Sequence, residues 1–332
     1  MSSLKLTFGC GPSDKVSAIF DGRVRIEGCE LSCFPIGPEE AFHRAFANQD
    51  FDLTELSSSS AILATSRGHN KYYALPIFIS RVFRHSAFYI RSDRGIRSPE
   101  DLRGKLIGVP EYQMTAALWA RGILSDEYGV KSHDIRWRNG GLNVAGRDER
   151  MPISLPPEFD LQTIPSSTTL STMLAEGELD GIITARAPAC FTTGAAHVER
   201  LFPDFRSAEE AYFRKTRMFP IMHLLAIRRS LVEEHPWLAA SVTKAFYHAK
   251  QLAMEEMMEI GVLPAMLPWL PDDLRRTQSV MGPDVWPYGV PDNRKVLEAM
   301  FRYSVEQGLA RRKIELEEFF APGTLHRMQG KD

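Results

Sequence analysis

Residues 98–110 read SPEDLRGKLIGVP, which combines a polar loop, a short helical stretch and an apolar strand. The strand is LIGV (106–109), and a helix is predicted from about Gln113 onward. A second unit follows, in which a serine-capped helix (166–176) precedes the strand GIIT (181–184). Strands that alternate with helices in this way favour an α/β fold with a parallel sheet.

The rest of the chain extends this pattern. Before residue 98, strands are predicted at residues 4–8, 29–36 and 51–56, and helices at residues 38–49 and 57–68. The helix at Pro38 has an acidic first turn, as a helix N-terminus favours. Residues 139–160 look irregular, residues 221–230 resemble a strand, and the remainder is mostly helical.

The length of 332 residues exceeds the size at which a single core usually divides, so two domains are expected. The pattern fits either a doubly wound enzyme or a two-lobed clamshell. SPEDLRGKLIGVP resembles the opening of the second lobe in type 2 periplasmic-binding-protein folds. This resemblance implies a ligand cleft between lobe one (residues 1–90 and 220–332) and lobe two (residues 91–219), with chain crossings near residues 89–91 and 195–220.

The composition excludes several classes of partner. Lys+Arg number 40 and Asp+Glu 42, so the formal charge of −2 does not indicate a nucleic-acid partner. No stretch approaches the ~20 apolar residues of a membrane span. The N-terminus lacks the features of a secretory signal, so a cytoplasmic location is expected. Cys10, Cys29, Cys33 and Cys190 are interpreted as ordinary thiols, with a metal site as the weaker alternative.

Candidate ligand-binding residues follow from one rule about open α/β sheets. Ligands bind beyond the carboxyl ends of the strands, where helix N-termini present unpaired N–H groups. The positions that this rule selects include Glu55, Ser57–Ser60, Glu111–Thr115 and Arg186. The serines either only cap a helix or bind a carboxylate. Glu55 is either a surface acid or an acid of raised pKa beside an anion-binding turn.

Three cationic side chains interrupt the apolar run LPIFISRVFRHSAFYI (75–90), which otherwise reads as a buried strand. They are Arg81, Arg84 and His85. Because an unpaired buried guanidinium is too costly, they are expected either at a sheet edge in water or along the cleft, where an anion would bind. Arg186 would approach the same cleft from lobe two, and its planar fork suits a carboxylate.

His223 lies in the apolar segment MFPIMHLLAIRR (218–229), close to the predicted return to lobe one. It is either a satisfied core side chain or a group that holds or delivers a proton, since imidazole titrates near neutrality. The sequence contains no glycine-rich nucleotide motif, no serine-nucleophile elbow and no HExxH zinc motif.

Longer segments are similar to the 4,5-dihydroxyphthalate decarboxylase family. They are FRHSAFYI, VPEYQMTAALWARGILSDEYGV, RWRNGG, RLFPDF, TRMFPIMHLLAIRR and HPWLAASVTKAF. The resemblance implies the non-oxidative loss of CO₂ from 4,5-dihydroxyphthalate, which gives 3,4-dihydroxybenzoate and requires no redox cofactor.

This reaction requires cations for the carboxylate that stays, a proton donor at the ring carbon and polar partners for the phenolic hydroxyls. The resemblance and these requirements together imply a set of residues that bind the carboxylate, namely Arg81, Arg84, Arg186, Ser57, Ser58, Gln113 and Thr115. His223 or His85 would donate the proton. Glu55 and Glu111 would hold the hydroxyls. No cofactor is expected; the alternative is a divalent metal held by the two histidines and a carboxylate.

Two other functions are compatible with these features. A non-catalytic solute-binding protein would capture a small aromatic carboxylate with the same cations. A precursor-synthesis enzyme that resembles this architecture would carry an iron motif rich in His and Cys, which the sequence lacks. The expected partner is a small aromatic dicarboxylate, with no nucleic acid and no membrane. The oligomeric state stays open.

Overall fold

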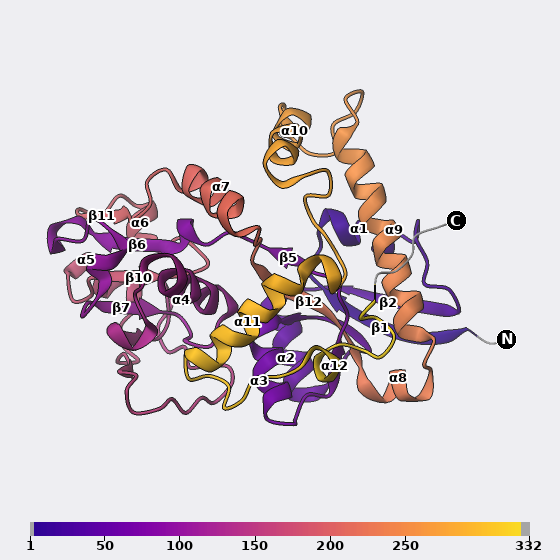
Figure 1. Cartoon of the computed structure of the whole chain (residues 1–332), viewed down its shortest axis with the longest axis horizontal. Helices are drawn as coiled ribbons and strands as arrows, with labels where there is room; N and C mark the ends of the chain where they lie inside the picture. The colour runs from indigo at the N-terminus through magenta and orange to yellow at the C-terminus, as the bar shows by residue number, and fades with distance from the viewer. Residues whose placement is uncertain (1–2, 327–332) are drawn as a thin grey trace.

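The computed structural model describes residues 3–326 and contains two six-stranded sheets. Figure 1 shows the two sheets in separate lobes along the long axis, each with helices packed around it. The predicted two-lobed α/β class is therefore confirmed. The sheets are mixed rather than purely parallel, because each contains at least one antiparallel strand.

The strands of the first sheet are β1 (Leu4–Cys10), β2 (Cys29–Pro35), β3 (Leu53–Ser57), β4 (Tyr72–Ala74), β5 (Ser80–Arg81) and β12 (Ile221–Arg228). They run in the order β2-β1-β3-β12-β4, and β5 also pairs with β12. β1 is parallel to β2 and β3, whereas β12 is antiparallel to β3. The register of β12 places His223 opposite Ser57, at the carboxyl end of β3.

The second sheet runs in the order β11-β6-β10-β7-β8-β9. Its strands are β6 (Phe88–Arg91), β7 (Leu106–Val109), β8 (Arg136–Asn139), β9 (Leu161–Thr163), β10 (Gly181–Ile183) and β11 (Val198–Arg200). β7, β8, β9 and β10 are parallel, so their carboxyl ends form one edge of the sheet. β6 is antiparallel to its two neighbours.

Helices connect and cover the strands. They are α1 (Asp14–Phe20), α2 (Pro38–Asn48), α3 (Ser58–Ser66), α4 (Thr115–Tyr128), α5 (Leu170–Glu176), α6 (Ala189–Thr192), α7 (Phe205–Thr216), α8 (Arg229–Glu234), α9 (Leu238–Met258), α10 (Leu270–Met281), α11 (Arg294–Glu306) and α12 (Leu316–Phe319). The predictions of a strand at LIGV and of a helix from about Gln113 are confirmed by β7 and α4. Within residues 3–326, none of these helices combines the length and the apolar character that a bilayer span requires.

The prediction of one strand over residues 75–90 is wrong. The segment contains the short strand β5, a 3₁₀ turn at His85–Ala87, and then β6. Because β5 belongs to the first sheet and β6 to the second, the chain crosses between the lobes at residues 82–87 rather than near residues 89–91. The chain returns between β11 and β12. An apolar run does not reveal that one strand ends and another begins in a different sheet.

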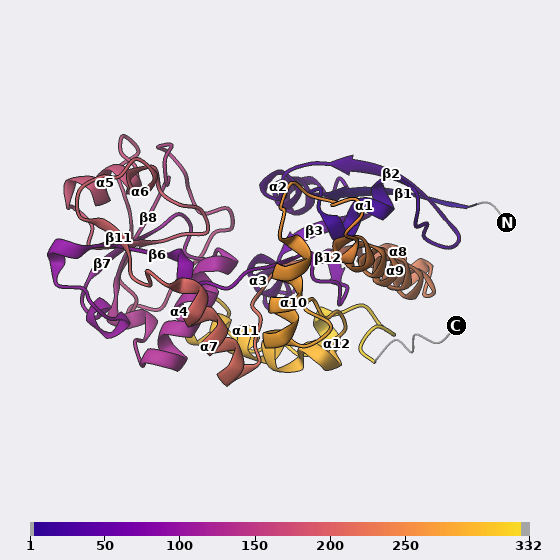
Figure 2. The same ribbon diagram turned by 90° about the horizontal axis from the view of Figure 1, so that it is seen from above.

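The larger of two hydrophobic clusters extends through both lobes, where α11 packs against α4, and the smaller lies within lobe two. A side chain at Gly122 of α4 would overlap the Tyr303 ring of α11, so glycine permits this close approach. Trp119 of α4 donates its indole N–H to the carbonyl of Ile221 in β12 at 2.9 Å. Figure 2 shows α11 between α4 and α12, along the side where the lobes meet.

Candidate active site

A cavity of about 640 Å³ lies between the lobes, at the carboxyl edge of the second sheet. Its walls come from the segment after β7, the loop after β8, the segment after β10 and the beginning of α2. The charged residues of the wall are Glu39, Glu111, Arg147, Asp148, Arg150 and Arg186. This is the place that the strand-end rule selects for a ligand.

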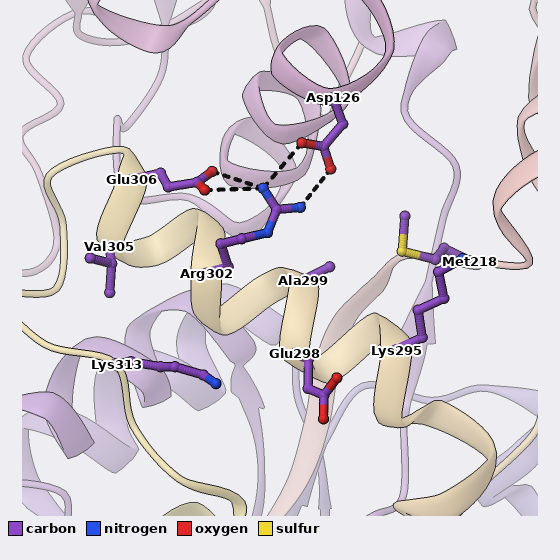
Figure 3. Close-up of a pocket in the computed structure, with 9 residues that line it drawn as sticks. All are labelled: Asp126, Met218, Lys295, Glu298, Ala299, Arg302, Val305, Glu306 and Lys313. Atoms are coloured by element: carbon purple, nitrogen blue, oxygen red, sulfur yellow. Dashed lines mark hydrogen bonds and ion pairs between the residues drawn. The ribbon is translucent and has the colours of Figure 1, made fainter.

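Another cavity of about 640 Å³ lies beside α11 (Figure 3). Three of its charged groups are engaged with one another, because Arg302 contacts both Asp126 of α4 and Glu306. Lys295 donates to the carbonyl of Thr216 at 2.7 Å. These contacts hold α11 against the neighbouring helices, so we assign this cavity to the junction of the helices and not to the active site.

Glu55 and His223 form a buried pair at the carboxyl end of β3. Glu55 is 2% exposed, and its Oε1 lies 2.6 Å from Nδ1 of His223. Its Oε2 accepts the Gly11 N–H at 3.0 Å. Burial acts to raise the pKa of Glu55, but the hydrogen bond and charge of His223 and the Gly11 N–H outweigh it, and the pKa is lowered. Glu55 is thus a carboxylate that holds Nδ1 of His223 and leaves Nε2 for a ligand.

Phe42 contacts both His223 of this pair and an arginine of the cavity wall. The imidazole lies edge-on to the Phe42 ring, with the ring centroids 4.8 Å apart. The guanidinium of Arg150 lies 5.5 Å from the centroid of the same Phe42 ring. The His223 side chain is 23% exposed, so it is the accessible member of the pair. An imidazole and a guanidinium from opposite lobes therefore meet around one aromatic ring.

Three arginines converge on Glu39, in the first turn of α2. Arg147, Arg150 and Arg186 are named the cleft arginines here. Their guanidinium nitrogens lie 3.2, 3.9 and 3.5 Å, respectively, from the Glu39 carboxylate oxygens. Arg147 and Arg150 also contact Oε1 of the buried Glu111. Burial acts to lower the pKa of Arg147, but the two carboxylates prevail and raise it. The cavity therefore has a cationic wall that already holds carboxylates.

A chain of hydrogen bonds leads from this wall to lobe one. Gln113 donates to Glu111 at 2.8 Å and accepts from the Ser60 hydroxyl at 2.8 Å. The Ser60 hydroxyl also lies 3.2 Å from the Ser57 hydroxyl, which lies 3.0 Å from the Thr115 hydroxyl. The first turns of α3 and α4 thus meet across the lobes. The buried Ser58 hydroxyl has no partner among the described residues.

Glu149 is an unexpected acid behind the cationic wall. Its carboxylate accepts the backbone N–H groups of Tyr112 and Gln113, and lies 3.5 Å from the Asn139 amide nitrogen. Burial raises the pKa of Glu149 to about 7. These contacts attach the loop of Arg147 and Arg150 to the turn before α4, and so they position the cationic wall.

Arg81, Arg84 and His85 lie elsewhere, where the chain crosses between the lobes, and are named the hinge cations here. Arg81 is buried and donates to the Asn293 side chain and the Pro287 carbonyl, and burial lowers its pKa to about 9. These partners belong to the segment before α11. The expectation of a sheet edge in water or a place along the cleft is therefore not met for Arg81.

The other two hinge cations are also enclosed by protein. Arg84 points Nε at the Met222 sulfur at 3.1 Å, and burial lowers its pKa to about 10. His85 packs against Phe202 and Tyr212, and burial lowers its pKa to about 4. Among residues 3–326, no group of three or more His, Cys, Asp or Glu is placed to hold a metal ion. The two histidines, His85 and His223, have different neighbours.

The structure brings together several residues that the sequence selected, namely Glu55, Ser57, Glu111, Gln113, Thr115, Arg186 and His223. Sequence reasoning missed Glu39, Arg147, Glu149 and Arg150. The last three lie in the RDER run (147–150) of the loop predicted to be irregular, where four charged residues in succession were a usable signal. Glu39 was interpreted only as part of an acidic first turn.

Two curated proteins are similar to this chain over much of its length. The 4,5-dihydroxyphthalate decarboxylase of Comamonas testosteroni is 42% identical over 325 residues, which covers 98% of both chains. The 4,5-dihydroxyphthalate decarboxylase of Pseudomonas putida is 44% identical over 214 residues, which covers 64% of this chain and 83% of the relative. No protein-family model matches the chain.

Solved structures share the fold at low sequence identity. The periplasmic aliphatic sulphonate binding protein SsuA of Escherichia coli is 13% identical with a TM-score of 0.53, covering 100% of this chain and 96% of SsuA. The desulfurization enzyme DSZB is 16% identical with a TM-score of 0.51, covering 97% of each chain. These similarities confirm the fold expected from SPEDLRGKLIGVP. With the identity to the two decarboxylases over so much of the sequence, the chain belongs to the 4,5-dihydroxyphthalate decarboxylase family.

Proposed function

We propose that the protein catalyses the decarboxylation of 4,5-dihydroxyphthalate to 3,4-dihydroxybenzoate and CO₂, and that the cavity between the lobes is its active site. The observation that carries the proposal is the Glu55–His223 pair, which presents an imidazole to the same Phe42 ring that Arg150 of the wall contacts. The names of the two curated relatives support the same reaction and the same class of substrate, an aromatic dicarboxylate.

The cleft arginines would bind the carboxylate that stays on the ring. A planar guanidinium makes two parallel hydrogen bonds to a carboxylate, which fixes the orientation of the ring as well as its place. Arg147, Arg150 and Arg186 reach the cavity from two segments of lobe two, so they can enclose one anionic group. Glu111 and the hydroxyls of Ser57, Ser58 and Thr115 would supply partners for the phenolic hydroxyls when the lobes adjust to the substrate.

His223 would deliver the proton that replaces CO₂. With Nδ1 held by Glu55, the Nε2–H would face the substrate ring. Each carboxylate of the substrate is para to a hydroxyl, which raises electron density at the ring carbon that accepts the proton. The carbon–carbon bond then breaks, its electron pair restores the aromatic ring, and CO₂ leaves. One proton is consumed for each CO₂ released.

The test is turnover of 4,5-dihydroxyphthalate by the purified protein, followed by CO₂ release and by the ultraviolet spectrum of the product, with and without a chelator. Turnover that survives chelation is expected. If the chelator abolished turnover and a divalent metal restored it, the reaction would depend on a metal ion and the proposal of His223 as the proton donor would be wrong. Saturable binding without CO₂ would instead favour the solute-binding alternative.

A further inference from the structure

We infer that Glu39 is an internal competitor for the carboxylate site, and that it occupies the position that a substrate carboxylate takes on binding. The inference rests on the proposed function. Three guanidiniums already converge on the Glu39 carboxylate at 3.2 to 3.9 Å, inside the cavity between the lobes. A ligand carboxylate that binds all three arginines has to replace this group.

Exposure and position in the fold distinguish Glu39 from Glu111, the other carboxylate that the cleft arginines contact. Glu111 is 2% exposed and belongs to lobe two, as do Arg147 and Arg150, so its contacts are part of one lobe. Glu39 is 44% exposed and comes from α2 of lobe one. Its separations from Arg150 and Arg186 are also long for ion pairs. Glu39 is therefore the carboxylate that can leave at little cost.

The charges of the wall support an exchange. Three arginines face three carboxylates in the wall, those of Glu39, Glu111 and Asp148, so the wall has no net charge. Adding a dicarboxylate beside all three acids would bring five carboxylates to three cations. When Glu39 withdraws, the wall has one net positive charge, which favours an anionic ligand. Glu39 thus neutralises the arginines while the cavity is empty and gives way to the ligand.

Phthalate is the probe that tests the inference, because it keeps both carboxylates but lacks the hydroxyl groups that the decarboxylation step requires. Calorimetric titration would compare the wild type, Glu39→Gln and the matched control Glu40→Gln. Glu40 is the neighbouring acid, but it contacts Arg44 of its own helix and not the wall. Glu39→Gln is expected to bind phthalate ~3- to 10-fold more tightly, because phthalate would no longer have to break the ion pairs between Glu39 and the arginines. The size of the effect is that of weak, partly exposed ion pairs. Glu40→Gln is expected to bind like the wild type.

Two results would overturn the inference. One is an unchanged or weaker affinity of Glu39→Gln for phthalate, which would mean that Glu39 supports the wall and does not compete with the ligand. The other is a loss of kcat of ~100-fold or more on 4,5-dihydroxyphthalate, the range expected for a proton-transfer group. The proposed function fails separately, if the wild type binds phthalate but releases no CO₂ from 4,5-dihydroxyphthalate.

Discussion

The hinge cations and the cleft arginines are the same kinds of residue in opposite surroundings. Arg81, Arg84 and His85 are enclosed at the crossing between the lobes. The cleft arginines border a cavity and contact carboxylates that a ligand can replace. Burial lowers the pKa of the hinge cations, whereas neighbouring carboxylates raise the pKa of Arg147. The basic residues of the apolar run 75–90 therefore make structural contacts, whereas those of the polar loop 147–150 border the cavity.

The largest expected effect separates the two histidines. His223→Gln removes the proposed proton donor, so kcat on 4,5-dihydroxyphthalate should fall by ~10³-fold. His85→Phe should change kcat by less than ~3-fold, because His85 packs against Phe202 and Tyr212 away from the cavity. Steady-state kinetics on both variants measures this. Equal losses would mean that the hinge histidine is also part of the active site.

Next in size is the effect of Arg81→Met on stability. The variant leaves the Oδ1 of the buried Asn293 without its charged donor, whereas the Pro287 carbonyl still accepts from the Asn293 amide at 3.0 Å, so the free energy of unfolding should fall by about 3 kcal/mol. Urea denaturation gives this value. Arg186→Met is the matched control, since its side chain is 76% exposed, and its stability should stay within ~0.5 kcal/mol of the wild type. If Arg81→Met were as stable as the control, Arg81 would not hold the segment before α11.

The third effect is a pH dependence from His85. Its pKa is about 4 in the folded protein and ~6.5 in an unfolded chain, so the unfolded chain binds more protons between these values. Stability should therefore fall as the pH is lowered through this window, by about 2 kcal/mol between pH 7 and pH 5. The His85→Phe variant should lose the part of this pH dependence that comes from His85 and keep the parts that come from other titratable groups. Urea titrations of both proteins at the two pH values measure it; parallel curves would contradict the prediction.

The smallest effect is expected for Arg186→Gln. Arg186 is the most exposed cleft arginine, and its single ion pair with Glu39 spans 3.5 Å. Its loss should raise KM about 5-fold and leave kcat nearly unchanged, because an exposed cation contributes little to the transition state alone. A change in kcat larger than the change in KM would place Arg186 next to the carboxylate that leaves.

The fold and half of the site follow from the sequence for identifiable reasons. The pattern of short strands and capped helices, with the motif SPEDLRGKLIGVP, predicted two lobes. The strand-end rule selected Glu55 and Glu111, because the carboxyl ends of parallel strands point to one edge. The atoms that each side chain contacts depend on how closely the two lobes approach each other. A local sequence pattern contains no information about the separation of the lobes.

The remaining residues were beyond local rules. The hinge cations were expected in water or in the cleft, since periodicity within residues 75–90 does not show that the run divides between two sheets. Arg147, Glu149 and Arg150 lie in a loop without regular structure, so no repeat of 2 or 3.6 residues assigns them a face. Their positions depend on long-range contacts such as those of Glu149 with the Tyr112 and Gln113 backbone.

The core shared through α4 and α11 has a consequence for thermal behaviour. Independent lobes would melt in two steps, and a ligand would shift each step differently. Here Trp119 and Tyr303 belong to one continuous apolar cluster, so neither lobe can open its interior without exposing part of the other. We therefore expect one calorimetric transition, whose midpoint a bound dicarboxylate raises as a whole. The lobes form two halves of a binding site but one unit of cooperative melting.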